Sequence, residues 1–81
     1  MADIRLLILS PEETLLDMAV DAVTLPGSLS PFEVLPDHAP ILSSLDRGVI
    51  TWRCGQEEGQ VEIASGFVEV KDNQVIAAVE R

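Results

Sequence analysis

Turn residues recur about every 8–12 residues along this 81-residue chain, the spacing typical of an all-β sandwich or barrel. The clearest turn signals are Ser10-Pro11, Pro26-Gly27, Asp46-Arg47-Gly48 and Asp72-Asn73. Between them lie short apolar segments and segments with alternating inward and outward faces, such as residues 48–54, 68–71 and 74–79. Helical periodicity is nowhere sustained. The pattern predicts one all-β domain that comprises residues 1–81.

The expected strands are short segments rich in β-branched and other apolar residues. They cover residues 4–9, 14–18, 19–25, 32–35, 41–45, 48–54, 61–64, 68–71 and 74–79. Residues 55–59 read as a polar hairpin loop, and Asp72-Asn73 as a two-residue turn that favours positive φ. In residues 19–25 we expect one face of Val20, Ala22 and Thr24 and an opposite face of Asp21, Val23 and Leu25. A helix over residues 12–22 is the alternative, and the β-branched pattern that runs into a proline stop favours strands.

Four of the five prolines and the only histidine lie between Leu25 and Leu42. Each proline removes a backbone donor and fixes φ near −65°, so this segment cannot be a helix or an interior strand throughout. Irregular loops mounted on a rigid scaffold commonly carry function. We therefore expect this segment to carry either chemistry or docking.

The charge balance excludes several classes of partner. Fourteen acidic residues face 5 basic ones, for a formal net charge of −9, whereas nucleic acids and anionic lipids are bound by Lys and Arg. A basic partner protein or simple solubility stays open. Cys54, the one cysteine, cannot form an intrachain disulfide, and one Cys with one His cannot build a zinc cage. We expect no metal and no cofactor.

The start of the chain, Met1 to Arg5, is acidic and lacks the basic region and cleavage site of a secretory signal. No apolar run approaches the roughly 20 residues that span a bilayer. These features predict a soluble, cytoplasmic chain.

Catalysis finds little support in the residue pattern. Asp37-His38 is the only adjacent acid–imidazole pair, and no nucleophile elbow accompanies it. We expect His38 to hydrogen-bond to backbone in a proline-rich turn. The glycines are too dispersed for a phosphate-binding loop.

Trp52 and Cys54 share one strand face and are expected in the core. The alternative for Trp52 is an interface anchor, and the alternative for Cys54 is a reactive thiolate. The sequence favours a binding or structural module stabilised by neighbours over an enzyme.

Several motifs in this order resemble a known family: Leu25-Pro26-Gly27, Leu35-Pro36-x-His38-Ala39-Pro40 and Ser65-Gly66-Phe67-x-Glu69-Val70. They are similar to the N-terminal domain of the ε subunit of bacterial F-type ATP synthases, a family that includes the chloroplast ε and mitochondrial δ subunits. The resemblance runs along essentially the whole chain. It implies a flattened β-sandwich of about ten short strands.

The resemblance also implies a non-catalytic subunit of the central stalk of the rotor. Such a subunit packs on the γ subunit, rests its loops against the c-ring and couples ion translocation to ATP synthesis. Its place is the cytoplasmic face of the bacterial membrane, as a peripheral protein. The alternative is a free-standing β-sandwich binding or adaptor module with no rotary role. A deep enclosed apolar pocket favours this alternative, and a flat apolar patch with loops at one end favours the stalk.

Two loops carry the residues that the resemblance assigns to γ and c-ring binding, and we expect them near one another at one end of the sandwich. The residues are Pro26, Gly27, Ser28, Leu29, Ser30, Pro31, Phe32, Glu33, Pro36, Asp37, His38, Ala39 and Pro40.

The sequence departs from the family pattern in three places. Residues 27–33 replace a glycine-rich loop, and Asp37 stands where relatives usually have glycine. Typical relatives continue into a C-terminal helical hairpin, which in some members binds ATP and inhibits hydrolysis, whereas this sequence stops at Arg81. Either the chain is naturally short, which its native-looking start favours, or it is a piece of a longer protein. We expect no helical hairpin and no ATP-dependent regulation in it.

Overall fold

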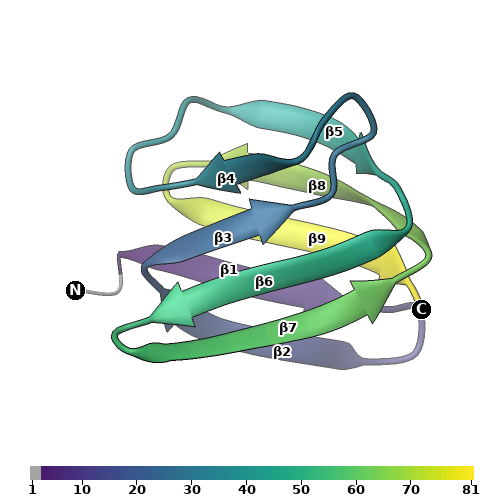
Figure 1. Ribbon diagram of the computed structural model, residues 1–81, viewed down its shortest axis with the longest axis horizontal. Coiled ribbons are helices and arrows are strands. Elements are labelled where there is room, and N and C mark those ends of the chain that lie inside the picture. Colours follow the sequence, from purple (N-terminus) through teal and green to yellow (C-terminus); the bar gives the residue numbers. More distant parts are fainter. Residues whose placement is uncertain (1–2) are drawn as a thin grey trace.

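The computed structural model describes residues 3–81, so Met1 and Ala2 of the acidic start lie outside the described part. These residues form nine strands, close to the expected ten, and no helix (Figure 1). The strands are β1 (Ile4–Leu9), β2 (Thr14–Val20), β3 (Ala22–Leu25), β4 (Phe32–Val34), β5 (Ile41–Leu45), β6 (Gly48–Cys54), β7 (Glu57–Ile63), β8 (Ser65–Lys71) and β9 (Gln74–Glu80). Within residues 3–81 there is accordingly no helix of membrane-crossing length and hydropathy.

The strands form two facing sheets, which confirms the β-sandwich. One sheet has five strands in the order β2-β1-β9-β8-β5, and the other has four in the order β4-β3-β6-β7. In Figure 1 the four-stranded sheet lies in front of the fainter five-stranded sheet. All strand pairs are antiparallel except β1 with β9, which places the first and last strands side by side in the middle of the larger sheet.

The core between the sheets is made only of apolar side chains, as far as residues 3–81 are concerned. Alternation along β6, β8 and β9 was expected to turn one face inward. Its inward positions are buried: Ile50, Val68, Val70, Val75, Ala77 and Val79. The predicted turn at Asp72-Asn73 is also confirmed, because both residues have positive φ, 52° and 61°.

The expected polar loop over residues 55–59 is wrong, because β7 already begins at Glu57. Gly55 adopts φ 64°, which permits a tight turn, and Cys54 pairs directly with Glu57. Glu57 and Glu58 are exposed on the strand, so their polarity reflects a solvated strand rather than a loop. Likewise β8 begins at Ser65, before the expected start at Val68.

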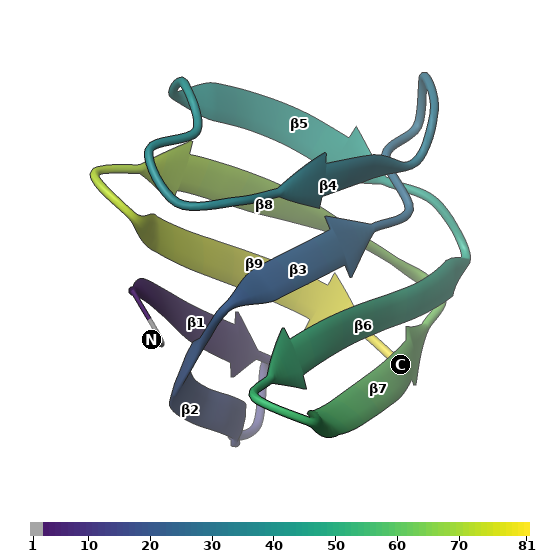
Figure 2. The same cartoon turned by 60° about the vertical axis from the view of Figure 1, so that its left-hand side comes forward.

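The expected strand over residues 19–25 is also wrong, because the chain changes sheets at Asp21. β2 belongs to the five-stranded sheet and β3 to the four-stranded sheet (Figure 2). The inward direction therefore reverses between the two strands. Val20, Ala22 and Val23 are therefore all buried, and the predicted alternation breaks. The Asp21 amide donates to the Arg53 carbonyl at 2.7 Å, and the Gly55 amide donates to Asp21 Oδ2 at 2.7 Å.

Trp52 packs against the core and covers a glycine on the neighbouring strand. It is half-buried, as expected of a core-packing residue, and it lies directly opposite Gly59 in the β6–β7 pair. A Cβ atom on Gly59 would come within 2.5 Å of the indole ring. Cys54, on the same strand, is free and only half-buried.

Gly59→Ala should therefore destabilise the domain by about 1–3 kcal/mol, because the new methyl group overpacks against the indole. In a Trp52→Leu background the same substitution should be neutral or stabilising, since glycine in a strand interior carries an entropic cost. Urea unfolding of the four proteins gives the coupling energy. If Gly59→Ala lowered the free energy of unfolding equally with Trp52 present and in the Trp52→Leu background, the indole would not be the cause of the destabilisation.

Asp17→Asn should flatten the acid limb of the stability profile. Arg5 Nε donates to Asp17 Oδ1 at 2.6 Å across β1 and β2, and this hydrogen bond holds the pKa of Asp17 below its ordinary value of 3.8. Because the folded pKa is the lower one, the pair stabilises the fold above about pH 4 and loses this effect as pH falls through the folded pKa. Urea unfolding between about pH 7 and pH 2 measures the difference, and identical profiles would refute it.

Candidate partner-binding surface

The outer face of the five-stranded sheet carries a cluster of apolar side chains, where a solvated sheet face would carry polar ones. The strand register aligns Leu9 with Ala78 and Phe67 in one row, and Leu7 with Ile76 in the next. Leu42, on β5, ends this second row, and Glu69 of β8 lies between it and Ile76. We call this cluster the apolar face; it consists of Leu7, Leu9, Leu42, Phe67, Ile76 and Ala78.

The two largest side chains at the β5–β8 side of this face are open to solvent. Leu42 is 78% exposed and Phe67 is 65% exposed. Single exposed apolar residues need no explanation, but apolar side chains gathered on one sheet face are typical of interaction sites. The apolar face is thus the first candidate for docking.

The opposite outer face, on the four-stranded sheet, is polar. Its outward positions include Thr24, Glu33, Thr51, Arg53, Glu58, Gln60 and Glu62. Val49, at 37% exposed, is the one large exposed hydrophobic side chain of the described β3, β4, β6 and β7. The sandwich is therefore two-sided, with one face suited to water and one to a partner.

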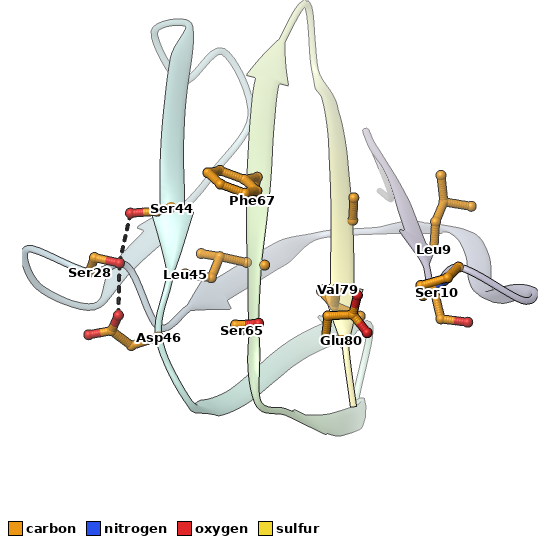
Figure 3. A pocket seen from close by; sticks show the side chains of 13 residues that line it. Leu9, Ser10, Ser28, Ser44, Leu45, Asp46, Ser65, Phe67, Val79 and Glu80 are labelled. Carbon is orange, nitrogen blue, oxygen red and sulfur yellow. Dashed lines mark hydrogen bonds between the residues drawn. The ribbon is translucent and has the colours of Figure 1, made fainter.

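A cavity of about 740 Å³ lies on the apolar face and opens to solvent (Figure 3). Leu9, Phe67 and Ala78 line it along the sheet. Ser28 and Asp46 line it where the sheet meets the loop between β3 and β4. The apolar face and this loop consequently border the same groove.

The loop formed by residues 26–31 is held to the end of β5. Backbone bonds join the Ser28 amide to the Ser44 carbonyl at 3.0 Å and the Asp46 amide to the Pro26 carbonyl at 2.9 Å. Gly27 bridges to Leu45, and a Cβ atom there would meet the Ser30 carbonyl oxygen at 2.6 Å. The leucine at position 29 is fully exposed, at 102%.

The loop formed by residues 36–40 is held at the other end of β5, against the β8–β9 turn. Asp37 has φ 66°, a conformation that favours glycine. Its amide donates to Asn73 Oδ1 at 2.6 Å, and Asn73 Nδ2 donates to Asp37 Oδ1 at 3.3 Å. His38 Nδ1 donates to the Ala39 carbonyl at 2.7 Å, which confirms the expected bond to backbone. Asp37 thus holds the positive φ without being glycine, and its amide and its carboxylate are both bonded to Asn73.

The expectation that both loops meet at one end of the sandwich is wrong. Residues 26–31 pack against Ser44 and Asp46, at the end of β5, whereas Asp37 packs against Asn73, beside its start. The reason is β4, which runs between the two loops and so separates them (Figure 1). A strand was predicted over residues 32–35, so this separation could have been inferred from the sequence.

Sequence reasoning also missed the apolar face. The available signal was that Leu6–Leu9 and Val75–Ala78 are apolar at both alternate positions, a pattern that strands acquire when both faces are covered. In β9, Val75 and Ala77 point inward while Ile76 and Ala78 point outward.

The described residues bring no catalytic constellation together. Ser28 and Ser44 lie at the opposite end of β5 from His38, and their hydroxyls bond to each other and to Asp46. No group of three or more potential metal ligands occurs within residues 3–81.

Comparison with known proteins places this geometry in context. The family model for "ATP synthase, Delta/Epsilon chain, beta-sandwich domain" matches residues 3–81. The ATP synthase epsilon chain of Leptospira borgpetersenii is 41% identical over 68 residues, which are 84% of this chain and 54% of that protein. The epsilon chain of Synechococcus elongatus is 36% identical over 72 residues, 89% of this chain and 53% of that one. This chain thus spans about half the length of these curated relatives.

Two solved structures are similar in shape. A chain of the Euglena gracilis mitochondrial ATP synthase, from an OSCP/F1/c-ring assembly, superposes with a TM-score of 0.92 at 25% identity, covering 100% of this chain and 52% of that one. A chain from the central stalk/c-ring of the Tetrahymena thermophila mitochondrial enzyme gives a TM-score of 0.82. Its 16% identity, over 98% of this chain and 64% of that one, supports the fold alone.

Asn73→Gly should release the loop of residues 36–40 without disturbing the turn, because glycine accepts the positive φ but offers no acceptor to Asp37. We expect exchange of the Asp37 amide hydrogen to accelerate about fivefold or more. Asp72→Gly is the matched control, since it changes the other positive-φ residue of the turn and leaves this pair intact. Hydrogen exchange followed by NMR measures this rate. An unchanged rate for the Asp37 amide in Asn73→Gly would show that the Asp37–Asn73 bonds do not hold the loop.

Proposed function

This chain belongs to the ATP synthase delta/epsilon family, and its residues 3–81 correspond to the β-sandwich domain of that family. We propose that it serves as a non-catalytic subunit of the central stalk. In this role it docks on the γ subunit and the c-ring and couples ion translocation to ATP synthesis. It then lies at the cytoplasmic face of the bacterial membrane as a peripheral protein.

The apolar face carries this proposal. When another protein covers the exposed Leu42 and Phe67, apolar surface is removed from water, and this burial favours binding. The opposite polar face has no comparable surface. We therefore assign the apolar face to the γ subunit.

The loop of residues 26–31 is the best candidate for the c-ring contact. It borders the apolar face and presents the fully exposed Leu29 to solvent. Phe32 and Glu33 follow it on β4. Pro36, Asp37, His38, Ala39 and Pro40 lie at the other end of β5, so we assign them to a separate contact with the stalk.

The alternative, a free-standing binding or adaptor module, is less well supported. A carrier of small molecules needs a cavity that encloses most of its ligand. The groove beside Phe67 opens to solvent along the sheet surface, a shape that suits a protein partner.

Phe67→Ser and Leu42→Ser should each weaken binding to the γ subunit about tenfold or more, the scale of an interface hot spot. Thermal stability should hardly change, because both side chains are exposed. Val49→Ser, on the polar face, is the matched control and should leave the affinity unaltered. Calorimetric titration of purified γ subunit from the same organism gives the affinities. Wild-type affinity in both apolar-face variants would rule out this docking mode.

A further inference from the structure

We infer that a chain of two side-chain hydrogen bonds, Ser44 to Ser28 to Asp46, is a positioning device that fixes the direction of the 26–31 loop. It thereby joins the loop and the apolar face into one rigid docking surface. This inference rests on the proposed function, since it concerns how the same surface is prepared for its partners.

The hydrogen bonds of the chain run in one direction. Ser44 Oγ donates to Ser28 Oγ at 2.8 Å, and Ser28 Oγ donates to Asp46 Oδ1 at 2.9 Å (Figure 3). Both distances fall within the usual range for O–H···O bonds. Each hydroxyl has a single proton, so both donors are used, and the chain ends on a carboxylate, which strengthens the last bond.

The two side-chain hydrogen bonds lie where the 26–31 loop contacts the end of β5. The Ser28 amide also bonds to the Ser44 carbonyl, so side chain and backbone of Ser28 are both tied to β5. Gly27 is buried just before it, and the loop closes over it through Ser30 and Phe32. With Gly27 and Ser28 fixed, the exposed Leu29 that follows is held in a defined direction.

The same three residues also line the groove on the apolar face, together with Phe67 and Ala78. A partner seated on the apolar face therefore meets the base of the loop. A loop that is already ordered before binding loses less conformational entropy when the partner docks. The two side-chain hydrogen bonds thus increase the affinity for the partner although their residues are not part of the hydrophobic core.

The solvent exposure of the three hydrogen-bonded residues argues against a role in folding alone. Ser28, Ser44 and Asp46 are all exposed, and none of them belongs to the buried cluster. Substitutions at such positions usually leave stability nearly unchanged. Loop order and protein stability can consequently be measured as separate quantities.

Substitutions at Asp46 separate the hydrogen bond from the charge. Asp46→Asn keeps an oxygen acceptor for Ser28, whereas Asp46→Ala removes it, and Ser28→Ala breaks both bonds of the chain. Ser43→Ala is the comparison variant. Ser43 Oγ donates at 2.9 Å to the Ser44 carbonyl, which also accepts the Ser28 amide, so this variant keeps both side-chain bonds and the backbone bond of Ser28.

The readouts are ¹⁵N order parameters of residues 28–30 in the free 81-residue chain and affinity for a purified complex of γ subunit and c-ring. We expect Asp46→Ala and Ser28→Ala to lower the order parameters and to weaken binding about three- to tenfold. Asp46→Asn and Ser43→Ala should remain close to wild type, and all four melting temperatures should agree.

Three results would overturn the inference: unchanged order parameters, lower order with unchanged affinity, or equal losses in Asp46→Asn and Asp46→Ala. Failure of the proposed function has a different signature. In that case Phe67→Ser keeps wild-type affinity, or wild type does not bind the complex, whatever the state of the loop.

Discussion

The parallel pairing of β1 with β9 is the constraint on which the rest of the structure depends. It places two strands whose middle residues are apolar on both sides at the centre of the five-stranded sheet. Their inward residues, such as Leu6 and Val75, form the core with the four-stranded sheet. Their outward residues, such as Leu7 and Ile76, then have no layer of this domain to cover them. The same pairing that completes the fold therefore creates the surface that we assign to a partner.

This arrangement fits the size of the domain. A chain of about 80 residues buries only about 60% of the surface that it exposes when unfolded, so its stability is small. Its single cysteine excludes an intrachain disulfide, and no cluster of metal ligands appears in residues 3–81. Any partner that binds the folded state alone adds stability by mass action. Covering the apolar face would thus stabilise the sandwich while building the interface.

The sequence predicted the parts of the fold that local physics decides. Alternation in β8 and β9 and the positive-φ turn at Asp72-Asn73 are set by neighbouring residues and were read correctly. The sheet change at Asp21 was missed, because the inward direction there depends on which sheet each strand joins. The apolar face was missed for a related reason: outward Ile76 resembles a core residue until the pairing of β9 is known. Of the candidate site, the loops were identified but their separation was not.

Both loops leave from the four-stranded sheet but are anchored to the five-stranded one. Residues 26–31 follow β3, yet their hydrogen bonds end on Ser44 and Asp46. Residues 36–40 follow β4, yet Asp37 is bound by Asn73 between β8 and β9. Since most of these anchors belong to the sheet that carries the apolar face, both loops are tied to that face rather than to the sheet from which they leave. Their spacing is then fixed by the length of β5, and a partner that seats on the face meets each loop at a set distance.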